Sequence, residues 1–389
     1  MQTEELLKTF TDLVTIDSPS FEEAGVAAYC EEALRNLGFT VCFDNSGKQT
    51  GSNTGNLLAS LPGNAHGVVV LAAHMDSVEP CCGIEPVIND GVITSAGDTV
   101  LGSDDKAGIA AILQGVKENL FMDRPCPSIV VVLTTAEEKN CQGAKYLDEA
   151  LLRDVIKSCV AQSADPDCLD GGPVPCVVFD SDGAPGTIVT GAPYHYSFVA
   201  RVAGKEAHAG VNPEQGVSAL EIAAKALASL EWGRLSEFST ANIGMIHGGQ
   251  AINVVANDCT VEGECRSVYE DRVKAQQIAI TEAFETQAKA LGGSVQVDWE
   301  IDYPGVFYQT DDPFLQLLKD AADAKGFPIT YLVSGGGSDA NVFSTKGLKP
   351  VTVGVGMTNF HSVDEYITVE DLENAARYVK AILLTMAAQ

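Results

Sequence analysis

Residues 67–76 read GVVVLAAHMD and join an apolar, mostly β-branched run to a histidine and an aspartate. A short continuous apolar run of this kind predicts a strand that is buried on both faces, as in the sheet of an α/β protein. His74 and Asp76 lie two residues apart where the run ends, so in extended geometry both side chains point to the same face. A polar turn after a strand would explain this pair equally well. The meaning of the pair therefore depends on the residues at the ends of the other predicted strands.

Other apolar runs also end in polar side chains that bind divalent metal ions. These runs are SIVVVLTT at 128–135, PCVVF at 175–179 and PVTVGVG at 350–356. Loops that follow parallel strands open on one edge of a sheet, where α/β proteins gather their ligands. A further acidic pair lies in LGSDDKAG, at the start of a predicted helix. The candidate residues on this edge are, in chain order, His74, Asp76, Asp104, Glu137, Glu138, Asp180 and His361.

Each acidic pair has an ordinary explanation when it is taken alone. Asp104 and Asp105 open a predicted helix, where the helix dipole favours acidic side chains, and the same argument applies to Glu137 and Glu138. Their coincidence on one edge favours a site instead. Two imidazoles and three carboxylates suit a pair of zinc-like ions, and a spare glutamate beside a ligand suits the base that activates water. The pattern therefore predicts a two-metal hydrolase.

Composition excludes several other classes of protein. A chain of 389 residues is long enough for two domains. The net charge of −29 argues against nucleic acid and against an anionic membrane as partners, because both bind clustered lysine and arginine. The 11 cysteines are odd in number and follow a charged, amphipathic start, so we expect reduced thiols and a cytoplasmic protein. No apolar run approaches the length of a membrane span.

The order of predicted elements indicates one domain inserted into another. Strands and helices alternate over residues 1–190 and again over 303–389, which predicts an α/β domain with a mixed sheet. Residues 191–302 instead follow the order β-α-β-β-α-β, which is typical of the ferredoxin-like α+β arrangement. Ser20 and Glu23 form a capping-box pattern for a helix that ends near Gly38. The other predicted helices cover residues 3–14, 105–119, 142–152, 216–231, 269–291, 312–325 and 369–386.

The order of the motifs resembles the di-zinc metallopeptidase family of peptidase T, carboxypeptidase G and aminoacylase, and above all its peptidase T-like group. The resemblance covers nearly the whole chain. It implies a zinc exopeptidase-like catalytic domain with an inserted ferredoxin-like lid that serves for dimerisation. The motifs that carry it are HMDSV at 74–78, TVLGSDDKAGIAAI at 99–112, TTAEE at 134–138, GKEAHAG at 204–210, GGQAINVV at 248–255 and GGGSDANVF at 335–343.

The resemblance implies a ligand set for two divalent ions in each subunit. His74 and Asp180 would bind one ion, Glu138 and His361 would bind the other, and Asp104 would bridge both. The expected metal is Zn²⁺, with Co²⁺ or Mn²⁺ as alternatives. For the ligand in the DSD segment, the family places its carboxylate directly after the strand, which favours Asp180 and leaves Asp182 as the alternative.

Two further residues receive catalytic roles from the same resemblance. Asp76 would orient the imidazole of His74. Glu137 would be the general base that activates the metal-bridging water and passes its proton to the leaving amine. The resemblance also implies a cis peptide bond between residues 104 and 105.

The resemblance assigns substrate binding to His208, Asn253, Arg266, Gly337 and Ser338. His208 would reach the active site of the partner subunit, where it would stabilise an oxyanion. Asn253 and Arg266 would hold the carbonyl and carboxylate groups of the substrate, and the amides of Gly337 and Ser338 would bind a carboxylate. Without the resemblance, these residues would be assigned to a loop, a turn cap, a solvated strand and a flexible turn.

The chain departs from the family pattern at Gly335 and Asn140. Related tripeptidases carry an arginine at the position of Gly335, which argues against strict tripeptide specificity. Asn140 replaces a glycine, and asparagine tolerates left-handed backbone better than most residues. We expect an exopeptidase that cleaves the N-terminal peptide bond of short peptides, as an aminopeptidase or tripeptidase, and that forms a homodimer through the lid. The alternatives are a deacylase of N-acyl amino acids and a non-hydrolytic metal-binding protein, although the latter would have no need of Glu137.

Overall fold

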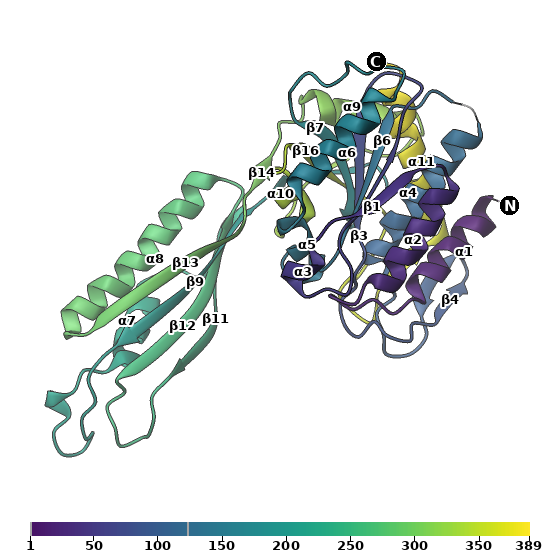
Figure 1. The fold of residues 1–389 in the computed structure, drawn as a ribbon. Coiled ribbons are helices and arrows are strands. Elements are labelled where there is room, and N and C mark those ends of the chain that lie inside the picture. The colour runs from purple at the N-terminus through teal and green to yellow at the C-terminus, as the bar shows by residue number, and fades with distance from the viewer. Residues whose placement is uncertain (1, 123) are drawn as a thin grey trace. The chain divides into compact units, whose positions relative to one another are not determined.

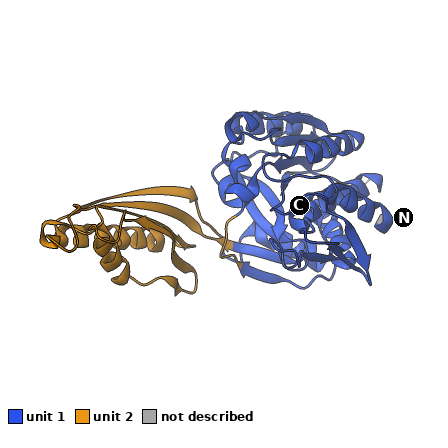
Figure 2. Cartoon of the chain, turned by 90° about the horizontal axis from the view of Figure 1, so that it is seen from below, with its two compact units in different colours: residues 1–190, 308–332, 338–389 blue, residues 191–307, 333–337 orange. Residues whose placement is uncertain are grey.

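The computed structural model describes residues 2–122 and 124–389, which form two compact units (Figure 2). Unit 1 consists of Met1–Thr190, Tyr308–Leu332 and Ser338–Gln389, and unit 2 of Gly191–Phe307 and Val333–Gly337. Unit 2 thus includes a glycine-rich stretch that the predicted boundaries place in the other domain. The mixed α/β fold class predicted from the sequence is confirmed.

A nine-stranded mixed sheet has the order β1-β2-β6-β3-β7-β16-β8-β14, with β15 paired to β8. Most of it lies in unit 1, where Figure 1 labels β1, β3, β6, β7 and β16, whereas β14 and the last two residues of β8 belong to the residues of unit 2. β3 runs parallel to both β6 and β7, and β16 runs parallel to β7, so the carboxyl ends of these four strands meet at one edge of the sheet. Every residue of β3 and of β6 is buried, as their continuous apolar runs predict. The strands are β1 (Thr40–Phe43), β2 (Leu57–Leu61), β3 (Val68–His74), β6 (Ser128–Thr134), β7 (Val174–Ser181), β8 (Thr187–Ala192), β14 (Val306–Phe307), β15 (Thr330–Val333) and β16 (Leu348–Gly354).

Helices cover this sheet, and a small hairpin sheet lies beside it. The predicted helix over 142–152 is wrong, because the chain breaks there into α5 (Gln142–Lys145) and α6 (Glu149–Ala161). The Asp148 side chain caps α6 by accepting a hydrogen bond from the amide of Leu151. The hairpin strands β4 (Pro86–Asn89) and β5 (Val92–Ser95) pair with β17 (Tyr366–Thr368). The helices of unit 1 are α1 (Gln2–Val14), α2 (Ala24–Asn36), α3 (Gly47–Thr50), α4 (Ser103–Phe121), α5 (Gln142–Lys145), α6 (Glu149–Ala161), α9 (Pro313–Asp323), α10 (Asp339–Phe343) and α11 (Val369–Met386).

The capping box predicted for α2 is also wrong. Glu23 occupies the N-cap position, but its side chain makes no capping hydrogen bond. Asn53 caps the helix instead, since its Oδ1 accepts a hydrogen bond from the amide of Ala24 at 2.9 Å. The Ser20 hydroxyl donates to Asp76 Oδ2 at 2.7 Å. Glu23 Oε1 accepts a hydrogen bond from the amide of Ala136. Both residues of the expected capping box therefore contact residues that are distant in the sequence.

Unit 2 has the predicted β-α-β-β-α-β order, with one additional short strand. Its sheet has the order β10-β11-β12-β9-β13. The helices pack on this sheet through Phe198, Ile222, Val261, Ile280 and Phe284, which are at most 2 % exposed. Its elements are β9 (Tyr194–Ala203), α7 (Ala219–Ala228), β10 (Gly233–Ser236), β11 (Ser239–Gly248), β12 (Asp258–Ser267), α8 (Glu270–Leu291) and β13 (Ser294–Tyr303).

Two further features concern the cysteines and the helices of the chain. All eleven cysteines are free thiols. Among the helices of the described residues, none combines the length and the apolar character that crossing a membrane would require.

Candidate metal centre and active site

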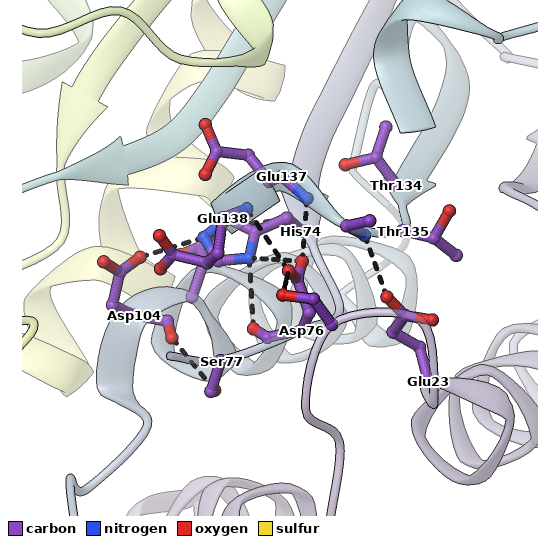
Figure 3. Close-up of polar contacts among 12 residues, drawn as sticks. Glu23, His74, Asp76, Ser77, Asp104, Thr134, Thr135, Glu137 and Glu138 are labelled. Carbon is purple, nitrogen blue, oxygen red and sulfur yellow. Dashed lines mark hydrogen bonds and ion pairs between the residues drawn. The ribbon is translucent and has the colours of Figure 1, made fainter. Parts of the chain in front are cut away.

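The carboxyl ends of four neighbouring strands bring the predicted site residues together. His74 is the last residue of β3, Glu137 and Glu138 follow β6, Asp180 lies near the end of β7, and His361 follows β16. The parallel pairing of these strands explains why side chains that are far apart in the sequence converge. Figure 3 shows several of them around the end of β3.

Two sets of donor atoms share the carboxylate of Asp104. In one set, His74 Nε2 lies 2.9 Å from Asp104 Oδ1 and 3.7 Å from Asp180 Oδ1. In the other, His361 Nε2 lies 3.1 Å from Asp104 Oδ2 and 2.9 Å from Glu138 Oε1. Within each set the donor atoms lie within 4.8 Å of one another. Asp104 thus directs one oxygen to each set, as a bridging ligand would.

The alternative ligand of the DSD segment lies elsewhere. Asp180 belongs to the first donor set, whereas Asp182 is exposed and is in neither set. The peptide bond between Asp104 and Asp105 is cis, which confirms the conformation implied by the resemblance.

The electrostatics of the cluster fit divalent cations. Burial raises the pKa of Asp180 and of Glu137 well above the usual range, and neighbouring carboxylates add to this effect although the charge of His74 opposes it. Burial also raises the pKa of Glu138. Hydrogen bonds to Asp104 and Glu138 raise the pKa of His361 to about 10. The cluster thus carries more negative charge than its own imidazoles offset, and its nitrogen and oxygen donors are those that Zn²⁺ takes in proteins.

Two buried carboxylates hold the turn that carries Glu137 and Glu138. Asp76 Oδ1 accepts a hydrogen bond from the Glu137 amide at 3.0 Å, and Asp76 Oδ2 accepts one from the Glu138 amide at 3.2 Å. Glu23 Oε1 accepts one from the Ala136 amide at 2.9 Å. Three consecutive amides of the turn are therefore fixed (Figure 3). The turn ends at Asn140 with φ of 67°, the left-handed conformation that asparagine tolerates.

Asp76 also holds the imidazole that begins the site. Its Oδ1 lies 3.3 Å from His74 Nδ1, and its backbone oxygen lies 3.1 Å from the same nitrogen. The fully buried Lys106 donates from Nζ to that backbone oxygen at 3.0 Å and to Ser77 Oγ at 2.7 Å. Asp76 therefore links the orientation of His74 to the position of Glu137, which extends the role that we expected for it.

The sequence analysis missed Glu365, which holds the segment that leads into Asp104. Glu365 Oε2 accepts hydrogen bonds from the amides of Leu101 and Gly102, each at 2.8 Å. Its Oε1 accepts from Ser103 Oγ at 2.5 Å and from the Asp104 amide at 3.1 Å. Its partners lie more than 260 residues away in the chain, so no local spacing could reveal this role.

The substrate-binding candidates of unit 2 are partly engaged with other groups. Arg266 donates from Nε and Nη2 to Glu264, at 3.1 and 2.8 Å, and from Nη1 to the Tyr303 hydroxyl at 3.3 Å. A hydrogen bond from His195, together with Arg266, lowers the pKa of Glu264 to about 2. The Gly337 amide donates to the same Tyr303 hydroxyl at 3.1 Å. Glu264 therefore stays ionised and offsets the charge of Arg266.

The remaining substrate-binding candidates differ in whether their polar groups are free to bind a substrate. His208 and Asn253 are exposed and adjacent in unit 2, because the Ala209 amide donates to the Asn253 backbone oxygen at 2.9 Å. Ser338, in unit 1, caps α10, and its amide donates to Asn341 Oδ1 at 3.0 Å. The amides of Gly337 and Ser338, both expected to bind a carboxylate, thus already have acceptors within the chain.

Comparisons with known proteins agree with this geometry. A family model described as peptidase family M20/M25/M40 matches residues 70–385. The uncharacterized protein YqjE of Bacillus subtilis is 36% identical over 379 residues, which are 97% of each chain. The solved structure of an aminopeptidase PepT from Bacillus cereus is 36% identical, covers 100% of this chain and 99% of its own, and gives a TM-score of 0.90. A tripeptidase from Staphylococcus aureus is 34% identical, with the same coverage and a TM-score of 0.89.

We predict that Glu365→Gln weakens divalent-ion binding while the fold is retained. The substitution turns one acceptor oxygen into a donor that faces the N–H groups or the hydroxyl of residues 101–104, so the Asp104 backbone loses its fixed position. Loss of such a supporting contact typically costs about 10–100-fold in metal affinity. Competition with a chelator measures the affinity, and Glu370→Gln, at an exposed glutamate nearby, is the control. Unchanged affinity in a folded Glu365→Gln protein would remove Glu365 from this role.

Proposed function

Because this chain belongs to peptidase family M20/M25/M40, we propose that it is a two-metal exopeptidase that removes the N-terminal residue from short peptides. The likeness to proteins described as an aminopeptidase and a tripeptidase extends over the whole chain and supports this choice. The observation that carries the proposal is the pair of donor sets that share Asp104, with Glu137 beside them.

The proposed ligands divide as the donor sets do. His74 and Asp180 hold one ion, Glu138 and His361 hold the other, and Asp104 contacts both. When bound, the ions would lower the pKa of a water molecule and polarise the carbonyl oxygen of the substrate. Imidazole and carboxylate ligands suit Zn²⁺, and they also admit Co²⁺ or Mn²⁺.

Glu137 is the proposed general base. Its carboxylate accepts a proton from the attacking water and delivers it to the nitrogen of the leaving amine. A base must stay within hydrogen-bond reach of the proton that it takes. The hydrogen bonds that Asp76 and Glu23 accept from the amides of the turn fix the backbone of Glu137 and so support this role. Asp76 also orients His74, so one carboxylate positions both a metal ligand and the base.

Unit 2 is the proposed lid and dimerisation domain, with His208, Asn253 and Arg266 binding substrate. Glu264 neutralises Arg266, and Gly335 provides no cationic side chain. These two features support short peptides in general, rather than tripeptides alone, as substrates. The free thiols support the cytoplasm as the compartment.

A substrate screen tests the proposed activity. The protein is loaded with Zn²⁺, Mn²⁺ or Co²⁺ and given dipeptides, tripeptides and their N-acetylated forms. Hydrolysis that requires a free α-amine is the expected result. Cleavage of N-acyl amino acids alone would identify a deacylase, and no hydrolysis with any metal would favour a non-catalytic binding protein.

We predict that Glu137→Gln abolishes turnover without changing metal content. The amide cannot accept the proton of the attacking water, and a general base typically contributes about 10²–10⁴ in rate. Metal analysis and kcat, measured on the same preparation, check both parts of the prediction. Glu22→Gln, at an exposed glutamate, should behave as wild type. Near-normal kcat in a metal-loaded Glu137→Gln protein would exclude Glu137 as the base.

We predict a homodimer in which His208 serves the partner subunit. β10 pairs only with the beginning of β11, and among the described residues nothing pairs with the outer side of residues 243–248. Met245 and Ile246 in this segment are each 50% exposed. A free strand edge of this kind is usually covered in natural proteins.

Complementation between two inactive proteins tests this arrangement. Mixing His208→Ala with Glu137→Gln should restore part of the activity, because one site of the mixed dimer then combines its own Glu137 with the partner's His208. Subunit exchange is verified separately with tagged chains. If verified exchange gives no recovery, His208 does not act across the dimer.

A further inference from the structure

A further group of potential metal ligands consists of Glu137, Cys141 and Asp339. Cys141 Sγ is 3.4 Å from Glu137 Oε1, and a carboxylate oxygen of Asp339 completes a set of donor atoms that lie within 4.8 Å of one another. Cys141 and Asp339 are each only 2% exposed. The three residues belong to unit 1, and the proposed ligand sets of the paired ions contain neither Cys141 nor Asp339.

Asp339 has a buried oxygen that is poorly satisfied within the protein. Its Oδ2 accepts a hydrogen bond from Thr134, whereas its buried Oδ1 has no partner at hydrogen-bond geometry, and the thiol of Cys141, a weak donor, is the other group that interacts with this carboxylate. A buried polar atom without a partner is costly. Burial raises the pKa of Asp339 to about 6, and burial followed by the charge of Glu137 raises the pKa of Cys141 well above its usual value. The environment thus disfavours negative charge here unless a cation accompanies it.

We propose that Glu137, Cys141 and Asp339 form a third cation site, which takes a thiophilic divalent ion such as Zn²⁺ or Cd²⁺ when that ion is in excess. The ion forms a bond to Cys141 Sγ and displaces the thiol proton to solvent, while carboxylate oxygens of Glu137 and Asp339 complete the protein ligands. A thiolate ligand selects soft or borderline ions over Mg²⁺ or Mn²⁺.

Occupation of this site inhibits the enzyme through Glu137. A carboxylate that is bound to a cation is a poor proton acceptor, so the base is lost while the paired ions remain in place. The third site fills after the other two, because it has no imidazole and one of its ligands must first lose a proton. This inference goes beyond the proposed activity and gives excess thiophilic metal a defined inhibitory target.

Cd²⁺ added to protein that already holds two equivalents of Zn²⁺ tests the site. The ultraviolet charge-transfer band of a cadmium–sulfur bond reports Cys141 directly and needs no substrate. We expect the wild type to form one more band-forming equivalent than Cys141→Ser, with loss of activity over the same concentration range as that equivalent. Both Cys141→Ser and Asp339→Asn should raise the inhibitory concentration about tenfold or more.

Cys159→Ser is the matched control. Cys159 is also buried, but its thiol donates to the Ile129 backbone oxygen. It belongs to none of the groups of potential metal ligands among the described residues. This variant should keep both the band and the inhibition. The proposal is overturned if the wild type forms no more band-forming equivalents than Cys141→Ser, or if Cys141→Ser is inhibited at the wild-type concentration. Because the band is read without turnover, failure of the proposed peptidase activity leaves this test intact.

Discussion

The burial of carboxylates at the carboxyl ends of the parallel strands of a mixed sheet is the constraint on which the rest of the structure depends. Taking an ionised carboxylate out of water is costly unless hydrogen bonds and opposite charge offset the loss. The fold supplies the fully buried Lys106 and two imidazoles there, and burial still raises the pKa of several of the acids. Two divalent cations are the natural compensation. The pKa is raised for Asp105, Glu137, Glu138, Asp180 and Asp339. For Asp76 and Asp104, hydrogen bonds with the imidazoles outweigh burial and lower the pKa.

A second tier of acidic side chains fixes the backbone on which this cluster rests. Asp76 and Glu23 hold the turn that carries the proposed base, Glu137, and Glu365 holds the segment that carries Asp104, the proposed bridging ligand. These carboxylates accept hydrogen bonds from backbone N–H groups and are not among the proposed metal ligands. The hydrogen bonds satisfy amides in irregular segments and give each functional side chain one position. Catalytic geometry thus follows from satisfying buried polar groups in loops at the sheet edge.

The sequence predicted the part of this arrangement that depends on periodicity and order. Continuous apolar runs identified the buried strands, and parallel pairing then placed His74 beside Asp180. Contacts between distant segments could not be predicted from the sequence, because no spacing rule connects Glu365 to Asp104 across the chain. Glu23 shows the same limit, since a local capping pattern was assigned to a residue that reaches the turn at Ala136. Local patterns specify elements, whereas the contacts that position a site are set by tertiary packing.

Titration of metal-free protein with Zn²⁺ in a calorimeter, for the wild type and for Asp104→Ala, tests the central claim most directly. The account predicts that the wild type binds two equivalents before any weaker third. It also predicts that Asp104→Ala loses both, because each proposed ion depends on one oxygen of this carboxylate. An Asp104→Ala protein that still binds two equivalents with wild-type affinity would contradict the shared ligand, and with it the proposed two-metal centre.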